Sequence, residues 1–419
     1  MSQTRPTRRD FAATTAAIAL GAIAGCVDDG NGDPEGIDDT AETDDSRETD
    51  DATDEVSATP PTDAPGSEGL LYAFAPEEIA IVDPDDGAVV DAIDPGFLAE
   101  WREPRIGAEY GEIYVIEHSR NQVVVIDADT RAVAAEIGVG PSPVHLYHPA
   151  DGELWAHADD EGTFHVIDTT DRAVVEFVEG VPTVEGHGKL LSHPDLGETA
   201  YSPNVTYPGV GVVDLAAYER VDTVSFGEAG GTHYKAYAPE TGLAYVEYGA
   251  ETVVLDTATD EIVDQLDVSG AISLSRDETT MAIVDGGTLR FIDATDPESA
   301  VISEVDAPGE PSTVRFGTDS ATAYAVNTAD DRILHVDVAD GTAIEELTID
   351  GVDPDTAGMS RRPAVTDGER LFTPAGEAGP LAVVDMDAGE VTATVDVPPG
   401  VNQLQYVGDS GSGYSGRAR

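Results

Sequence analysis

Short apolar runs that end in an aspartate recur along the chain from residue 69 onward. They are rich in Val and Ile, and successive runs are 37 to 48 residues apart. A fixed period near 42 residues is typical of a supersecondary unit that repeats along the chain. The eight terminal residues of these runs are Asp83, Asp127, Asp168, Asp214, Asp256, Asp293, Asp337 and Asp385.

Each period contains several short runs of Val, Ile, Tyr and Thr, separated by Gly, Pro or Asp turns. This pattern predicts a four-stranded antiparallel unit. A single such sheet cannot bury both of its faces, but radial stacking of identical sheets can. The sequence therefore predicts an all-β protein, an eight-bladed β-propeller. Seven blades are the fallback, because the repeat around 272–305 is short.

The two ends of the repeat region complement each other. The first repeat begins at LLYAFAP and lacks its first strand, whereas VNQLQYV follows the last complete unit as an orphan strand. Pairing of these two segments would close the ring and remove exposed sheet edges. The propeller domain is accordingly expected over residues 69–409, followed by a flexible tail at 410–419.

These repeats resemble the YVTN-type propeller repeats and the related eight-bladed cytochrome d1-like rings. The resemblance covers nearly all of residues 69–409 and implies an architecture, because propellers carry many unrelated functions. The repeated aspartates are expected to form turns. The loops at Asp83, Asp127 and Asp385 lack the terminal Glu and the spacing of a calcium loop.

The N-terminal segment reads as an export signal. Paired Arg8 and Arg9 precede an apolar stretch that ends in Gly-Cys, which resembles a twin-arginine signal with a lipobox. That resemblance implies cleavage and lipidation at Cys26, the only cysteine of the chain. Residues 1–26 are thus predicted to be a lipoprotein signal, and the protein to be an extracytoplasmic, membrane-anchored lipoprotein on the cell surface.

Residues 27–68 contain 16 Asp or Glu and almost no large apolar side chain. Such a segment cannot offset the entropy of ordering and is predicted to be a disordered acidic tether. The whole chain has 83 acidic and 21 basic residues, a formal net charge of −62. This charge excludes nucleic acid as a partner and is typical of a salt-adapted, halophilic protein.

Only two of the basic residues are lysines, and both fall in segments expected to be innermost strands. Aligning the repeats places a basic residue there in most blades, while Ser273, Gln403 and Gln405 fill other blades. We therefore expect a positive channel within a negative shell, although pairing with acids of neighbouring blades would also account for these cations. The expected cationic ring consists of Arg105, Lys189, Lys235, Arg315 and Arg361.

Three consecutive blades add a histidine to this lining: His145, His187 and His233. Three converging imidazoles with an open position suit zinc or copper, provided that a carboxylate such as Glu247 or Glu185 offsets the nearby lysines. The same channel could instead bind an anionic small molecule, since guanidinium and protonated imidazole match carboxylate or phosphate. A cell-surface scaffold for partner proteins is the third alternative.

A weaker resemblance favours the metal. The segments GHGKLLSHPDLGETAYSPN and MSRRPAVTDGERLFTP resemble parts of periplasmic zinc metallochaperones that serve zinc importers. The resemblance implies a propeller that passes metal to an importer's solute-binding protein, and only His187 lies in a matching segment. His187, His233 and Glu247 also imitate the metal site of antibiotic lyases on YVTN-like rings, but no nucleophile elbow or haem-attachment motif is present. We expect a binding protein more than an enzyme.

Of the other histidines, His118 and His157 end predicted second strands and are expected either near the channel mouth or in loops. His148 and His193 precede prolines and read as exposed turn residues, while His165 and His335 lie inside predicted strands. The sequon that begins at Asn204 is expected to be accessible.

Overall fold

The computed structural model describes residues 66–409, except 108–109, 184, 310, 354–358 and 360–361. The predicted signal, the lipidation site Cys26, the tether up to residue 65 and the tail at 410–419 lie outside the described residues, as does Arg361.

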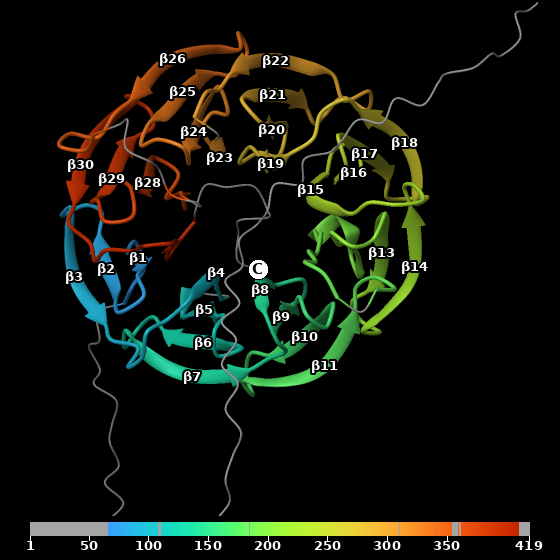
Figure 1. Cartoon of the computed structure of the whole chain (residues 1–419), viewed down its shortest axis with the longest axis horizontal. Helices are drawn as coiled ribbons and strands as arrows, with labels where there is room; N and C mark the ends of the chain where they lie inside the picture. Colours follow the sequence, from blue (N-terminus) through green and yellow to red (C-terminus); the bar gives the residue numbers. More distant parts are fainter. Residues whose placement is uncertain are drawn as a thin grey trace, which may run out of the picture. The chain divides into compact units, whose positions relative to one another are not determined.

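The described chain forms eight antiparallel sheets in a ring (Figure 1). The first blade contains β1 (Leu71–Phe74), β2 (Ile79–Asp83) and β3 (Ala88–Ile93), with β31 (Gln403–Tyr406) as its innermost strand. The second contains β4 (Trp101–Ile106), β5 (Glu112–Glu117), β6 (Gln122–Asp127) and β7 (Ala132–Gly138). The third contains β8 (Pro143–Tyr147), β9 (Glu153–Ala158), β10 (Thr163–Asp168) and β11 (Ala173–Glu179). The fourth contains β12 (Thr199–Pro203), β13 (Gly209–Asp214) and β14 (Glu219–Ser225).

The remaining four blades complete the circle in chain order. The fifth contains β15 (Thr232–Ala238), β16 (Leu243–Tyr248), β17 (Glu251–Asp256) and β18 (Glu261–Leu266). The sixth contains β19 (Ala271–Leu274), β20 (Thr280–Asp285), β21 (Thr288–Asp293) and β22 (Val301–Asp306). The seventh contains β23 (Pro311–Phe316), β24 (Thr322–Asn327), β25 (Ile333–Asp337) and β26 (Thr342–Leu347). The eighth contains β27 (Val365–Thr366), β28 (Arg370–Pro374), β29 (Leu381–Asp385) and β30 (Glu390–Val395).

The predicted eight-bladed architecture is confirmed, including its closure. Strand β31 pairs antiparallel with β1, with Leu71 opposite Tyr406 and Phe74 opposite Gln403. The short repeat around 272–305 forms a complete sheet, β19 to β22, so the seven-bladed alternative is not needed.

The hydrophobic core lies between neighbouring blades. Each main cluster draws its side chains from two adjacent sheets, because the middle strands are apolar on both faces. Between the first two blades, Trp101 packs edge-on against Phe74 at 5.8 Å, and its indole N–H donates to the carbonyl of Ala75 at 2.8 Å. Burial of such large side chains fixes each blade against the next.

The repeated aspartates form turns, as expected. The carboxylate of each accepts a hydrogen bond from a backbone N–H two or three residues later. This contact stabilises the turn between the third and fourth strands. In every blade the register also shifts by one residue near the end of the third strand, a β-bulge at an equivalent place.

The fourth blade differs from the others at the axis. Residues 186–193 take the place of a regular inner strand and touch β12 through two isolated bridges, Gly188 to Asn204 and Leu191 to Tyr201. A Cβ on Gly188 would lie 2.3 Å from Nε2 of His157, so only glycine lets the segment pass this close to the third blade. This irregular segment carries His187 and Lys189.

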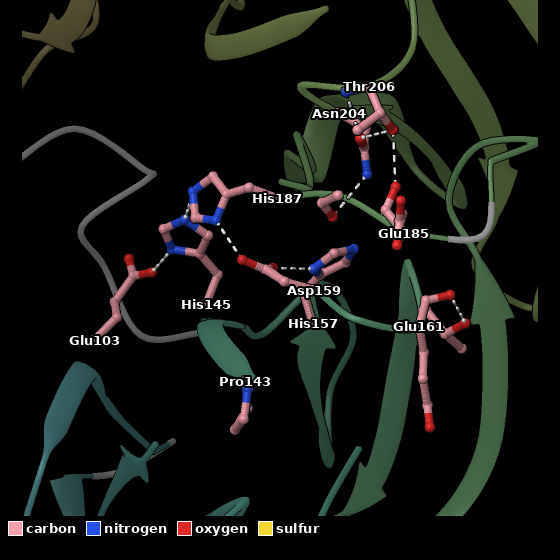
Figure 2. Close-up of polar contacts among 12 residues, drawn as sticks. Glu103, Pro143, His145, His157, Asp159, Glu161, Glu185, His187, Asn204 and Thr206 are labelled. Carbon is pink, nitrogen blue, oxygen red and sulfur yellow. Dashed lines mark hydrogen bonds and ion pairs between the residues drawn. The ribbon is translucent and has the colours of Figure 1, made fainter. Parts of the chain in front are cut away.

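Three predictions about exposure are wrong. His148 is half-buried, with its Nδ1 2.8 Å from the carbonyl oxygen of Glu153. His193 is only 8% exposed, because its ring accepts a hydrogen bond from the backbone N–H of Asp195 and begins the short 3-10 helix η2 (Pro194–Leu196). Asn204 is 1% exposed, since its side chain donates to the carbonyl of Gly186 and accepts from Thr206, so the sequon is not accessible in the folded domain (Figure 2). No helix of the described chain is long and apolar enough to cross a membrane.

Candidate functional site

The inner strands bring the predicted channel residues to the axis at two levels. Arg105, Ser273 and Arg315 each lie opposite the third residue of the second strand in their own blade. In β8, Tyr147 is the residue at this level, opposite Trp155. His145 comes two residues earlier, opposite His157, and so lies at a second level. Alternate residues of a strand share a face, so Glu103 and Arg105 lie on one face of β4, and His145 and Tyr147 on one face of β8.

A continuous line of polar contacts joins two of the predicted histidines (Figure 2). The Glu103 carboxylate accepts a hydrogen bond from Nδ1 of His145. Nε2 of His145 lies 2.9 Å from Nε2 of His187. Nδ1 of His187 lies 2.7 Å from Asp159, whose second oxygen lies 2.8 Å from Nδ1 of His157.

These contacts determine the tautomers of the two facing imidazoles. A carboxylate oxygen only accepts, so Nδ1 of His145 and Nδ1 of His187 must each carry a proton. In the neutral rings both Nε2 atoms then hold lone pairs, and these point at each other across 2.9 Å. Such an arrangement requires a shared proton or a cation between the rings.

Burial disfavours a proton on the His145 side of this contact. The pKa of His145 is held well below its usual value, first by burial and then by the charge of Lys189. His145 is 5% exposed, so an imidazolium there would be poorly solvated. Asp159 remains ionised, because hydrogen bonds from His157 and His187 outweigh its burial and lower its pKa. Both Nε2 lone pairs are satisfied without charging His145 either by a proton carried on His187 or by a cation between the rings.

The third predicted histidine lies beside this pair without completing it. The rings of His187 and His233 are 5.1 Å apart, and Nδ1 of His233 is 3.7 Å from Glu247. Glu247 also accepts the backbone N–H of Tyr234 at 3.2 Å. Within the residues that the structure describes, no three acidic, histidine or cysteine side chains are already arranged as a metal-ligand set.

The two lysines lie against tyrosine rings. The Lys189 ammonium is 5.1 Å from the ring centre of Tyr234, and that of Lys235 is 5.6 Å from the ring centre of Tyr147. Burial, with Lys189 as the next cause, lowers the pKa of Lys235 to about 7. Its positive charge near the histidines is therefore weak at neutral pH.

Sequence reasoning missed two residues of the site, Glu103 and Asp159, and left His157 open between the channel mouth and a loop. Glu103 lies 42 residues before His145, which is one repeat period. Asp159 lies two residues after His157, at the end of β9. Glu103 could have been predicted by aligning the acidic residues of the repeats as well as the basic ones. Glu185, considered as a balancing carboxylate, is exposed and takes no part.

No protein-family model matches the chain, and no curated protein matches its sequence. Solved structures do share its fold. Dihydro-heme d1 dehydrogenase NirN, in complex with DHE, aligns with a TM-score of 0.68 and 16% identity over 85% of this chain and 79% of its own. Apo AztD from Citrobacter koseri aligns with a TM-score of 0.58 and 12% identity over 80% and 96%. Kuenenia stuttgartiensis hydrazine synthase aligns with a TM-score of 0.51 and 13% identity over 67% and 94%.

At these identities the likeness concerns the fold. It confirms the predicted resemblance to cytochrome d1-like rings and to zinc metallochaperone propellers at the level of architecture. The chemistry of the channel must be argued from this chain's own side chains.

Proposed function

We propose that the channel binds one divalent transition metal, zinc or copper, between His145 and His187, in a metallochaperone-like role. The observation that carries the proposal is the pair of Nε2 atoms 2.9 Å apart, with both Nδ1 atoms held by carboxylates. Metal-ligating histidines commonly donate their other N–H to a carboxylate in this way.

The spacing suits coordination by both rings. With bonds of about 2.0–2.1 Å, two nitrogens 2.9 Å apart subtend an angle of about 90° at a metal, and opening them by about 0.5 Å would give the tetrahedral angle. His233 is the third donor in this proposal, since Glu247 already lies beside its Nδ1 and leaves Nε2 available. The fourth position would then be open for water or for a receiving protein's ligand.

The charges near the rings favour a dication. Glu103, Asp159 and Glu247 supply three carboxylates, and hydrogen bonds or nearby cations lower the pKa of all three despite their burial. Arg105 and Lys189 oppose them, while Lys235, whose pKa is lowered to about 7, is only about half protonated at neutral pH. Carboxylates therefore outnumber the permanent cations around the two facing nitrogens.

We further propose that this propeller is exported by its twin-arginine signal and anchored through lipidated Cys26, with 27–68 as a tether. The receiving partner would be the solute-binding protein of a metal importer, as the likeness of the segment around His187 to metallochaperones suggests. Replacing Cys26 with serine should move the protein from the membrane fraction to the medium. Retention in the membrane would contradict the anchor without bearing on the metal.

The metal proposal is tested by loading the full chain with zinc or copper in molar salt and measuring bound metal after dialysis. The wild type should retain close to one ion, and His187→Ala should lose it, because the facing lone pair is gone. Removing one of three protein ligands should weaken affinity at least about 100-fold.

The matched control is His165→Gln, in the same blade as His145. His165 contacts Glu161 at 3.1 Å and packs on Phe177, which is 57% exposed, in the outer part of the sheet. This variant should keep its metal. Equal metal content in wild type and His187→Ala would overturn the proposal and favour a scaffold for partner proteins.

A further inference from the structure

A second polar cavity lies on the channel wall away from the facing histidines. It has a volume of about 170 Å³ and is lined by inner strands of the second, seventh, eighth and first blades. Its polar lining includes Glu103, Arg105, Thr313, Arg315, Gln403 and Gln405. The histidines lie on the third, fourth and fifth blades, so the two sites occupy different arcs of the ring.

Three arginines line the cavity, and they have different partners. Arg362 is fully buried; its Nε donates to the carbonyl of Pro374 at 2.8 Å, its Nη1 lies 4.0 Å from Asp331, and its Nη2 has no hydrogen-bond partner.

Arg105 pairs with the carboxylate of Glu103, which also accepts the hydrogen bond from His145. Arg315 donates from Nη1 to the carbonyl of Val314 at 3.0 Å, whereas its buried Nε has no hydrogen-bond partner. No acid of the described chain forms an ion pair with Arg315.

The surroundings make this guanidinium unusual. Burial, and then the positive charge of Arg105, lower the pKa of Arg315 to about 10. A buried charge without a counter-ion is costly. The chain has 83 acidic residues and could readily have placed one here. Instead the cavity combines three guanidinium groups with one lining carboxylate, that of Glu103, which is already shared.

We propose that this cavity binds a small oxyanion, a carboxylate or a phosphate, with Arg315 as its main partner. The planar fork of a guanidinium matches two oxygens of such a group, and Arg315 has donors left for it. The amides of Gln403 and Gln405 and the hydroxyl of Thr313 line the same cavity. Its volume would hold several waters, which is enough for a compact anion.

This site does not need the metal. It requires none of the three channel histidines, and its ligand supplies the negative charge that the arginines lack. Glu103 is the one residue common to both sites, since its carboxylate contacts His145 and Arg105.

The proposal is tested by thermal unfolding of the metal-free full chain at constant molar sodium chloride, with added succinate or inorganic phosphate. The wild type should show a saturable rise in Tm, about 3–5 °C at a hundredfold excess over Kd. Arg315→Gln should lose this saturable rise. Without added oxyanion, Arg315→Gln should melt at a higher temperature than the wild type, because it removes an unpaired buried charge. Arg315→Lys should respond at least tenfold more weakly.

Arg290→Gln is the matched control, because Arg290 pairs with Glu304 on the outer part of the sixth blade. It should keep the full response, as should His187→Ala, which separates this site from the proposed metal site. Equal responses in wild type and Arg315→Gln would overturn the proposal. The same saturable shift with bromide would assign the cavity to a halide instead, and would overturn the oxyanion as well.

Discussion

The two arcs of the channel differ in which charge lacks a partner. The histidine arc contains His145, His187 and His233, and the arginine arc contains Arg105 and Arg315. On the histidine arc, each imidazole Nδ1 lies near a carboxylate, and what is left over is a pair of lone pairs that need a shared proton or a cation. On the arginine arc, the carboxylate of Glu103 pairs with Arg105 and no acid of the described chain pairs with Arg315, so the charge without a partner is positive and needs an anion. In a chain of charge −62, the local placement of a few acids decides which ligand each arc suits.

Among the variants proposed for this comparison, we expect the largest loss of stability from a substitution at Gly188, in the irregular inner segment of the fourth blade. Gly188→Ala would place a Cβ 2.3 Å from Nε2 of His157. Either the segment that carries His187 or the buried His157 ring, which contacts Asp159, must therefore move. We expect a loss of about 2–4 kcal/mol in the free energy of unfolding and the loss of metal binding. Denaturant unfolding measures the first and metal content the second.

Gly138→Ala is the comparison for that variant, because nothing lies within 4 Å of a Cβ at Gly138. It should change stability by less than about 0.5 kcal/mol. If Gly188→Ala retained both stability and metal, the close passage of this segment would not be what positions His187.

A substitution at Asp159 tests whether carboxylates orient the imidazole rings of the histidine arc. Asp159→Asn keeps the shape of the side chain but removes the charge that fixes the proton on Nδ1 of His187. Zinc affinity, measured by titration calorimetry, should fall about 10–100-fold, as is usual for such supporting carboxylates. The neighbouring exposed Asp160→Asn should bind as the wild type does. Unchanged affinity in both would remove Asp159 from the site.

We expect the smallest effect from Lys235, which should make the free energy of unfolding depend on pH. In the unfolded chain its ammonium keeps its proton up to about pH 10.4, whereas in the fold its pKa is about 7. Between these values the unfolded chain binds more protons, so the stability of the wild type should rise with pH. We expect a rise of about 1 kcal/mol from pH 7 to 9, reduced by the partial exposure of Lys235.

Lys235→Met should lack that rise, which urea unfolding at the two pH values would measure. If both proteins gained equally, other groups would be responsible and Lys235 would remain charged in the fold. The histidine arc would then be less favourable for a dication than proposed.

Repetition explains why the fold was predictable and the site only partly so. Equivalent strands recur at a fixed spacing, so the blades, their number and the pairing of β31 with β1 follow from the chain itself. The inner-strand positions of His145, Arg105 and Arg315 follow in the same way. The partners of these residues do not, because each contact joins side chains from different blades and depends on bulges and on the irregular fourth blade.

The amino-acid sequence by itself determined the ring, because apolar alternation and turn residues act locally and repeat. It also determined that histidines and scarce cations would lie on inner strands. Only the tertiary structure decided that His145 faces His187, that Asp159 holds His187 and that Arg315 lacks an acid. The reason is geometric: hydrogen bonds and ion pairs form over a few ångströms, and a shift of one residue in register or one missing strand changes which groups meet.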